Sequence, residues 1–161
     1  ALSAENKTRL HAENVRFLKS DLFAGLQGEH YDLIVTNPPY VTNDETDALP
    51  QEYSYEPEMG LRAGDDGLDL VLKILRDAPL HLTEDGLLIC EVGESEQHLI
   101  KLLPELPLMW IEFQVGQMGI FVVERHDLVT HSAKITRLAA ERDGKTSAAV
   151  EATGSAGAGL F

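Results

Sequence analysis

The fold of this chain is decided by residues 32–40, which read Asp32-Leu33-Ile34-Val35-Thr36-Asn37-Pro38-Pro39-Tyr40. The first five residues are largely apolar and partly β-branched, which predicts a short buried strand. The strand must end at Asn37, because each proline that follows fixes φ at about −65° and lacks an N–H. Open α/β sheets bind their ligands at the carboxyl ends of their strands. The sequence therefore predicts a stiff, ligand-binding loop at residues 37–40, which we call the Asn37 corner.

Hydrophobic spacing elsewhere predicts an α/β fold, a mainly parallel sheet with an antiparallel C-terminal hairpin. Helices are expected at residues 1–13, 67–82, 95–103 and 127–142. Strands are expected at residues 15–18, 32–36, 87–92, 110–115 and 120–124. Pro79 should end the second helix near Asp77, and Asp85-Gly86 signals a turn before the next strand. Residues 41–66 show no strong period, and so long a loop is usually functional or disordered.

Composition limits the classes of function. The chain has 161 residues, of which 27 are acidic and 13 basic, and a net charge of −14. Non-specific binding to duplex DNA depends on Lys and Arg, so direct binding of nucleic acid is not expected. A basic partner such as a ribosomal protein suits this charge better. No apolar run approaches the length of about 18 residues that indicates a membrane span.

The cysteine and the histidines bear on location and on metals. Cys90 is the only cysteine, lies in an apolar run and cannot form an internal disulfide. No charged-then-apolar leader opens the chain, and together these features favour a reducing, cytoplasmic location. The six histidines show no ligand spacing, so no metal site is expected.

The Asn37 corner has the chemistry to hold a planar NH₂ group. The side-chain oxygen of Asn37 can accept one N–H, and the carbonyl of Pro38, held by the rings of Pro38 and Pro39, can accept the other. Two acceptors orient the nitrogen and favour its pyramidal form, whose lone pair can then attack. Tyr40 offers a flat face for stacking, although a half-buried tyrosine at a strand end is the plain structural alternative.

Asn-Pro-Pro-Tyr directly after Asp-Leu-Ile-Val-Thr resembles the hallmark of the Rossmann-like class I methyltransferases that alkylate amide-like nitrogens. The likeness continues through residues 49–53, 56–58, 64–70, 88–93 and 110–113. In these blocks the chain is similar to the glutamine N(5)-methyltransferases, and closer to those acting on ribosomal protein L-three than on release factors. The resemblance implies transfer of a methyl group from S-adenosylmethionine to the side-chain amide nitrogen of a glutamine in a ribosomal protein.

The resemblance also implies roles for particular residues. The Asn37 corner, Pro39 included, would bind the substrate amide, and Asn37, Pro38 and Tyr40 would be the catalytic residues. Asp21, with Leu22 beside it, would bind the cofactor by accepting a hydrogen bond from the adenine amine, and Asn37 would also border the cofactor. A turn or a helix cap is the structural alternative for Asp21.

The first two strands of such a fold are not found in the sequence. A Gly-rich turn for close approach to the cofactor and an acid for its ribose do not precede residue 15. We therefore expect an N-terminally incomplete catalytic domain at residues 1–126. Residues 127–161 are expected to form a helix and a flexible tail rich in Ala, Gly and Ser. The missing strands would leave a sheet edge exposed, which favours a homodimer.

Two other functions fit some of the same features. An adenine-N6 DNA or RNA methyltransferase would use the same corner on a flipped base, but the acidic charge argues against it. A truncated, non-catalytic remnant would explain the absent Gly-rich turn.

Overall fold

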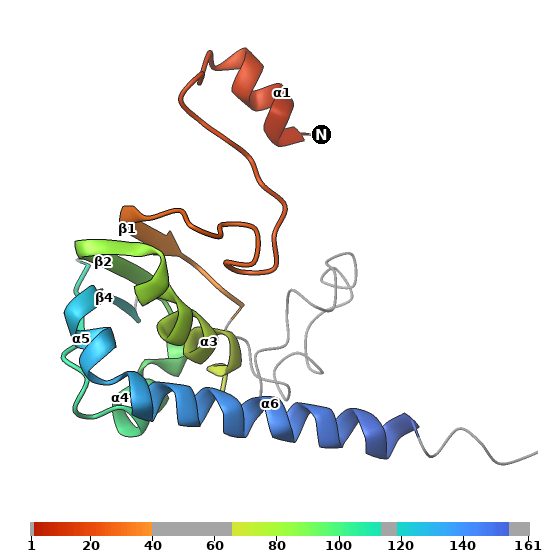
Figure 1. Cartoon of the computed structure of the whole chain (residues 1–161), viewed down its shortest axis with the longest axis vertical. Coiled ribbons are helices and arrows are strands. Elements are labelled where there is room, and N and C mark those ends of the chain that lie inside the picture. Colours follow the sequence, from red (N-terminus) through yellow and green to blue (C-terminus); the bar gives the residue numbers. More distant parts are fainter. Residues whose placement is uncertain (1, 40–65, 114–118, 155–161) are drawn as a thin grey trace, which may run out of the picture.

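The computed structural model describes residues 2–39, 66–113 and 119–154 (Figure 1). In chain order the elements are α1 (Leu2–Arg9), β1 (Tyr31–Thr36), α3 (Asp69–Asp77), η3 (Ala78–Leu80), β2 (Leu82–Glu91), η4 (Gly93–Ser95), α4 (Glu96–Leu102), β3 (Met109–Ile111), β4 (Ile120–Glu124), α5 (Arg125–Thr130) and α6 (Ser132–Gly154).

The described strands form one mixed sheet in the order β1-β2-β4-β3. β1 and β2 are parallel, and α3 lies on the connection between them. β4 runs antiparallel to both β2 and β3. The α/β class and the antiparallel C-terminal hairpin are thus confirmed, but the described sheet is mixed rather than mainly parallel. The hairpin's own turn lies outside the described residues.

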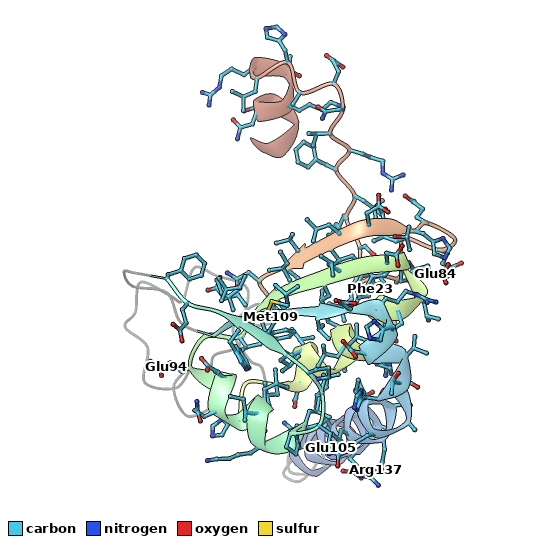
Figure 2. The ribbon with its side chains drawn as sticks, turned by 90° about the vertical axis from the view of Figure 1, so that its left-hand side faces the viewer. Phe23, Glu84, Glu94, Glu105, Met109 and Arg137 are labelled. Atoms are coloured by element: carbon cyan, nitrogen blue, oxygen red, sulfur yellow. The ribbon has the colours of Figure 1, made fainter. Side chains whose placement is uncertain are left out.

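The strand predicted at residues 15–18 is wrong. This segment has no regular structure, and Phe17 and Leu18 are about half exposed. A strand requires a hydrogen-bonded neighbour, and no strand in the described part of the chain lies on the outer side of β1. The apolar, β-branched pattern therefore has no ladder to join. In Figures 1 and 2, α1 and the chain after it stand apart from the sheet.

Of two boundaries predicted from local chemistry, one is confirmed and the other is wrong. Pro79 ends α3 at Asp77 as expected, and it begins the 3₁₀ turn η3. The turn expected at Asp85-Gly86 instead lies inside β2. Tyr31 pairs with Leu82 and Leu33 with Leu87, so the residues between are accommodated as an irregularity in the ladder.

The core lies on one face of the sheet. Cys90 pairs with Phe121 across β2 and β4, and both side chains are fully buried. Trp110 of β3 packs edge-on against Phe121 with the ring centroids 5.4 Å apart. In Figure 2 the helices from α3 to α6 gather on this side. Burial is the main reason that the pKa of the Cys90 thiol is raised to about 12.

The other face of the sheet carries an apolar row that no described element covers. The strand register aligns four side chains across the sheet, namely Val35, Ile89, Val122 and Met109. The two at the ends of the row are 67% (Val35) and 64% (Met109) exposed. We call this surface the open face. It continues to the edge of β1 with which no described strand pairs, where Leu33 is 49% exposed.

The residues after β4 form two helices rather than the single helix predicted at residues 127–142. α5 ends at Thr130, and α6 begins at Ser132. Leu128, Ile135 and Ala139 from these helices are fully buried in the same core as α3. The boundary placed at residue 126 therefore falls inside α5, and α6 packs directly against α3.

Candidate functional site

The Asn37 corner follows β1 at the carboxyl end of the parallel pair. Thr36 is the last strand residue and pairs with Cys90 of β2. Asn37 is exposed, Pro38 is buried and Pro39 is half-buried. This arrangement leaves the Asn37 amide accessible on a backbone that Pro38 anchors. Tyr40 lies outside the described residues, so its stacking role stays a prediction.

The residues predicted to bind the cofactor line a separate cavity. Asp21 and Leu22 are part of its wall, and the volume is about 440 Å³. Phe23 stacks on His81, with ring centroids 4.9 Å apart and planes 9° from parallel. Leu22 has a φ of 45°, a left-handed conformation that costs a side chain with a Cβ about 1–2 kcal/mol. The loop is therefore held in a conformation that leucine does not favour.

Asp21 and Leu22 line the part of this cavity near the start of β1, and α3 lines it as far as Leu70. The Tyr31 N–H at the start of β1 donates to the carbonyl of His81 (2.9 Å), the residue on which Phe23 stacks. Figure 2 likewise shows Phe23 toward the same end of the molecule as Glu84, in the irregular part of β2. A strand of six residues spans about 20 Å. Asn37 is not among the residues that line this cavity.

The charged groups that α3 and α6 contribute to the cavity wall are paired with one another. Lys73 contacts Asp143 of α6 at 2.7 Å, and Arg76 contacts Asp77 at 2.7 Å. The hydrogen bond to Asp77 raises the pKa of Arg76. Cations already neutralised by carboxylates are poor sites for a further anion. The cavity therefore offers a mixed polar surface rather than a phosphate-binding one.

A second ionic cluster was not predicted from the sequence. Arg142 of α6 contacts Asp66 and Asp69 at the start of α3, at 2.5 Å and 3.0 Å. Both aspartates lie at the start of the helix expected at residues 67–82, which is observed as α3. The sequence could not pair them with Arg142, because the partner is 76 residues away from Asp66 and no local pattern links such distant positions.

Metal and membrane features were searched in the described part of the chain. No cluster of three or more His, Cys, Asp or Glu side chains there could hold a metal ion. No helix among the described residues is both long and apolar enough to cross a membrane.

Comparison with known proteins places these features in a family context. Residues 1–53 match the family described as methyltransferase small domain. The chain is 80% identical over 142 residues to the ribosomal protein uL3 glutamine methyltransferase of Xanthomonas campestris, a match covering 88% of this chain and 46% of the relative. The predicted resemblance to the glutamine methyltransferases is confirmed.

Other glutamine methyltransferases give the same picture. The ribosomal protein uL3 glutamine methyltransferase of Xylella fastidiosa (strain Temecula1) is 68% identical over 142 residues, with 88% of this chain and 46% of the relative covered. That of Francisella tularensis is 45% identical over 120 residues, with 74% and 38% covered. The chain spans about half the length of these relatives or less. A methyltransferase domain with a mixed four-stranded α/β sheet is consistent with the class I fold.

Proposed function

We propose that this chain carries the substrate-binding corner of an enzyme that methylates the side-chain amide nitrogen of a glutamine in ribosomal protein uL3. The observation that carries the proposal is the exposed Asn37 at the carboxyl end of β1, set on a buried Pro38. The names of the relatives support this substrate over DNA or RNA. The net charge of −14 also suits a basic protein substrate.

The corner acts on the amide through two acceptors. The side-chain oxygen of Asn37 accepts one N–H of the glutamine amide, and the carbonyl of Pro38 accepts the other. This pairing orients the nitrogen and withdraws its lone pair from the amide π-system. Stacking on Tyr40 would hold the amide plane. S-adenosylmethionine, the donor implied by the methyltransferase family, would supply the methyl group.

The described residues do not fit a complete cofactor site. The cavity that Asp21 and Leu22 line does not include Asn37 in its wall. We therefore derive no step through the cofactor from this arrangement. The role of Asp21 toward the adenine stays a proposal, and it requires the loop at residues 20–25 to approach the carboxyl end of β1.

The open face supports the proposal that the site is completed by further polypeptide. The relatives are about twice as long as the matched region. An apolar row and an unpaired strand edge become buried when another element packs against that side of the sheet. On this proposal, residues 1–126 contribute the catalytic part and residues 127–161 the C-terminal helix and tail. Alone in solution, the chain would associate with a second copy through the edge of β1.

The decisive experiment follows methyl transfer from tritiated S-adenosylmethionine to purified uL3. Asn37→Ala, made at the matching position of the Xanthomonas campestris relative, should reduce turnover at least a hundredfold, the scale for removing one preorganised polar group. Asn14→Ala removes an exposed asparagine outside the corner and serves as the matched control. Near-normal turnover of the Asn37 variant would disprove the two-acceptor mechanism. Labelling of DNA instead of uL3 would establish the adenine-N6 methyltransferase alternative. Labelling of neither substrate would establish the alternative of a non-catalytic remnant.

A further inference from the structure

Arg142 joins α6 to the first turn of α3 through a two-pronged contact. Its Nη1 and Nη2 atoms donate to the two carboxylate oxygens of Asp66, at 2.5 and 2.6 Å. Nη1 also donates to Asp69 at 3.0 Å. The side chain of Arg142 is only 19% exposed. A planar guanidinium that grips a carboxylate in this way fixes geometry as well as charge.

Asp66 passes this restraint on to the backbone of α3. Its Oδ1 atom accepts the N–H of Leu68 at 3.2 Å. This satisfies one of the backbone N–H groups at the helix start that have no acceptor within the helix. Leu68 is fully buried, and its carbonyl accepts the N–H of Leu72 at 2.9 Å. Asp69 is the first residue of α3. One guanidinium therefore contacts two carboxylates at the start of α3, and one of these carboxylates also accepts the N–H of Leu68.

The ion cluster is maintained at neutral pH. Burial alone would raise the pKa of Asp66, but the hydrogen bond and charge of Arg142 outweigh it, and the pKa is lowered. The hydrogen bond to Asp66 likewise raises the pKa of Arg142. Both groups therefore stay charged.

The first turn of α3 lies at the same edge of the sheet as the Asn37 corner. β1 and β2 are parallel, so the chain leaves the carboxyl end of β1 and must return to the amino end of β2. The last turn of α3 continues through η3 to His81, at the amino edge. Its first turn is consequently at the carboxyl edge. Figure 1 shows the chain leaving β1 and re-entering α3 on one side of the molecule, above α6.

We propose that Arg142 is a positioning residue for substrate binding, holding the first turn of α3 at the edge where the Asn37 corner receives the glutamine. The proposal rests on the proposed function. Loosening this turn lowers the fraction of molecules whose sheet edge is in the conformation that binds substrate. The apparent Kd for the substrate then rises by the inverse of that fraction. The C-terminal helix α6 thereby becomes part of the binding apparatus.

The test compares three variants of the full chain. Arg142→Ala removes the cluster, and Arg142→Lys restores one point charge without the planar fork. Arg137→Ala removes another arginine of α6, labelled in Figure 2, whose pair with Glu141 (3.8 Å) is exposed. Ile135 and Ala139 keep α6 packed in every variant. Hydrogen exchange of the amides of residues 68–72 and calorimetric binding of purified uL3 are measured for each.

Arg142→Ala should speed exchange of these amides about tenfold and raise the Kd for uL3 about fivefold or more, since the competent fraction falls correspondingly. Arg142→Lys should recover part of both effects, and Arg137→Ala should change neither. A fall in Tm with unchanged uL3 affinity would show that the cluster is merely structural and overturn the proposal. If the unchanged chain does not bind uL3, the proposed function fails in this chain. The exchange data then decide whether Arg142 positions the first turn of α3. Unaltered exchange of residues 68–72 in Arg142→Ala would refute this positioning role too.

Discussion

Gly119 offers the sharpest test of the packing at the carboxyl edge of the sheet. It precedes β4 and has a φ of +73°, and its carbonyl accepts the N–H of Val92 at 2.7 Å. A Cβ added there would lie 2.1 Å from the carbonyl oxygen of Gly93 and 2.7 Å from its nitrogen. These are backbone atoms, so no side chain can move aside. Gly119→Ala must therefore separate the start of β4 from η4, the turn that follows β2.

The cost can be worked out from two terms. The left-handed conformation costs alanine about 1–2 kcal/mol, and loss of the Val92 hydrogen bond costs about 1 kcal/mol. We expect the free energy of unfolding to fall by about 3 kcal/mol, and Tm by roughly 6–12 °C for a chain of this size. Urea unfolding followed by the fluorescence of Trp110, which packs on the buried Phe121, measures it.

Gly144 provides the matched control. It lies in α6 with no atom within 4 Å of an added Cβ, so Gly144→Ala should stabilise the chain by about 0.5–1 kcal/mol through helix propensity. If Gly119→Ala unfolds within about 0.5 kcal/mol of the unchanged chain, a surface-like effect, the described contact between the two glycines is wrong.

Three further predictions concern the ion cluster, the core and the open face. The pKa of Asp66 is lowered in the fold, so ionised Asp66 adds to the free energy of unfolding above the ordinary pKa of 3.8. This contribution is lost as the pH falls through the folded pKa. In an acid titration, the free energy of unfolding of Arg142→Ala should therefore depend less steeply on pH than that of the unchanged chain. Ile135→Ala should cost about 2–5 kcal/mol in urea unfolding, whereas the exposed Thr136→Ala should cost little. Val35→Lys should abolish self-association in light scattering, and Leu80→Lys, also at an exposed apolar residue, should not; a dimer unaffected by Val35→Lys would exclude the open face.

Signals that act within a few residues were sufficient to predict several elements. Pro79 limits α3 by its own chemistry, and the strand Ile120–Glu124 was predicted with its observed bounds. Both elements also find partners in the described chain, namely α6 for α3 and β2 and β3 for β4. Local pattern and tertiary context agree there.

The failures come where a partner decides the outcome. The pattern at residues 15–18 fits a strand, but the part of the chain that the structure describes has no neighbouring strand to pair with it. Asp66 and Arg142 form their contact across 76 residues, which spacing cannot reveal. The Asn37 corner was predictable because two prolines dictate its backbone, whereas the place of Asp21 depends on how an irregular loop packs on His81.

The burial of Cys90 makes the stability of β2 accessible to simple thiol chemistry. With a pKa of about 12 and no exposed surface, this thiol stays protonated and shielded in the folded chain. Only the thiolate reacts rapidly with alkylating or disulfide reagents, and unfolding returns the group to its ordinary acidity. Because the sequence contains no other cysteine, each labelling event reports one opening of the central strand pair. Labelling rates would thus rank ligands and partners by how strongly each suppresses the opening that exposes Cys90.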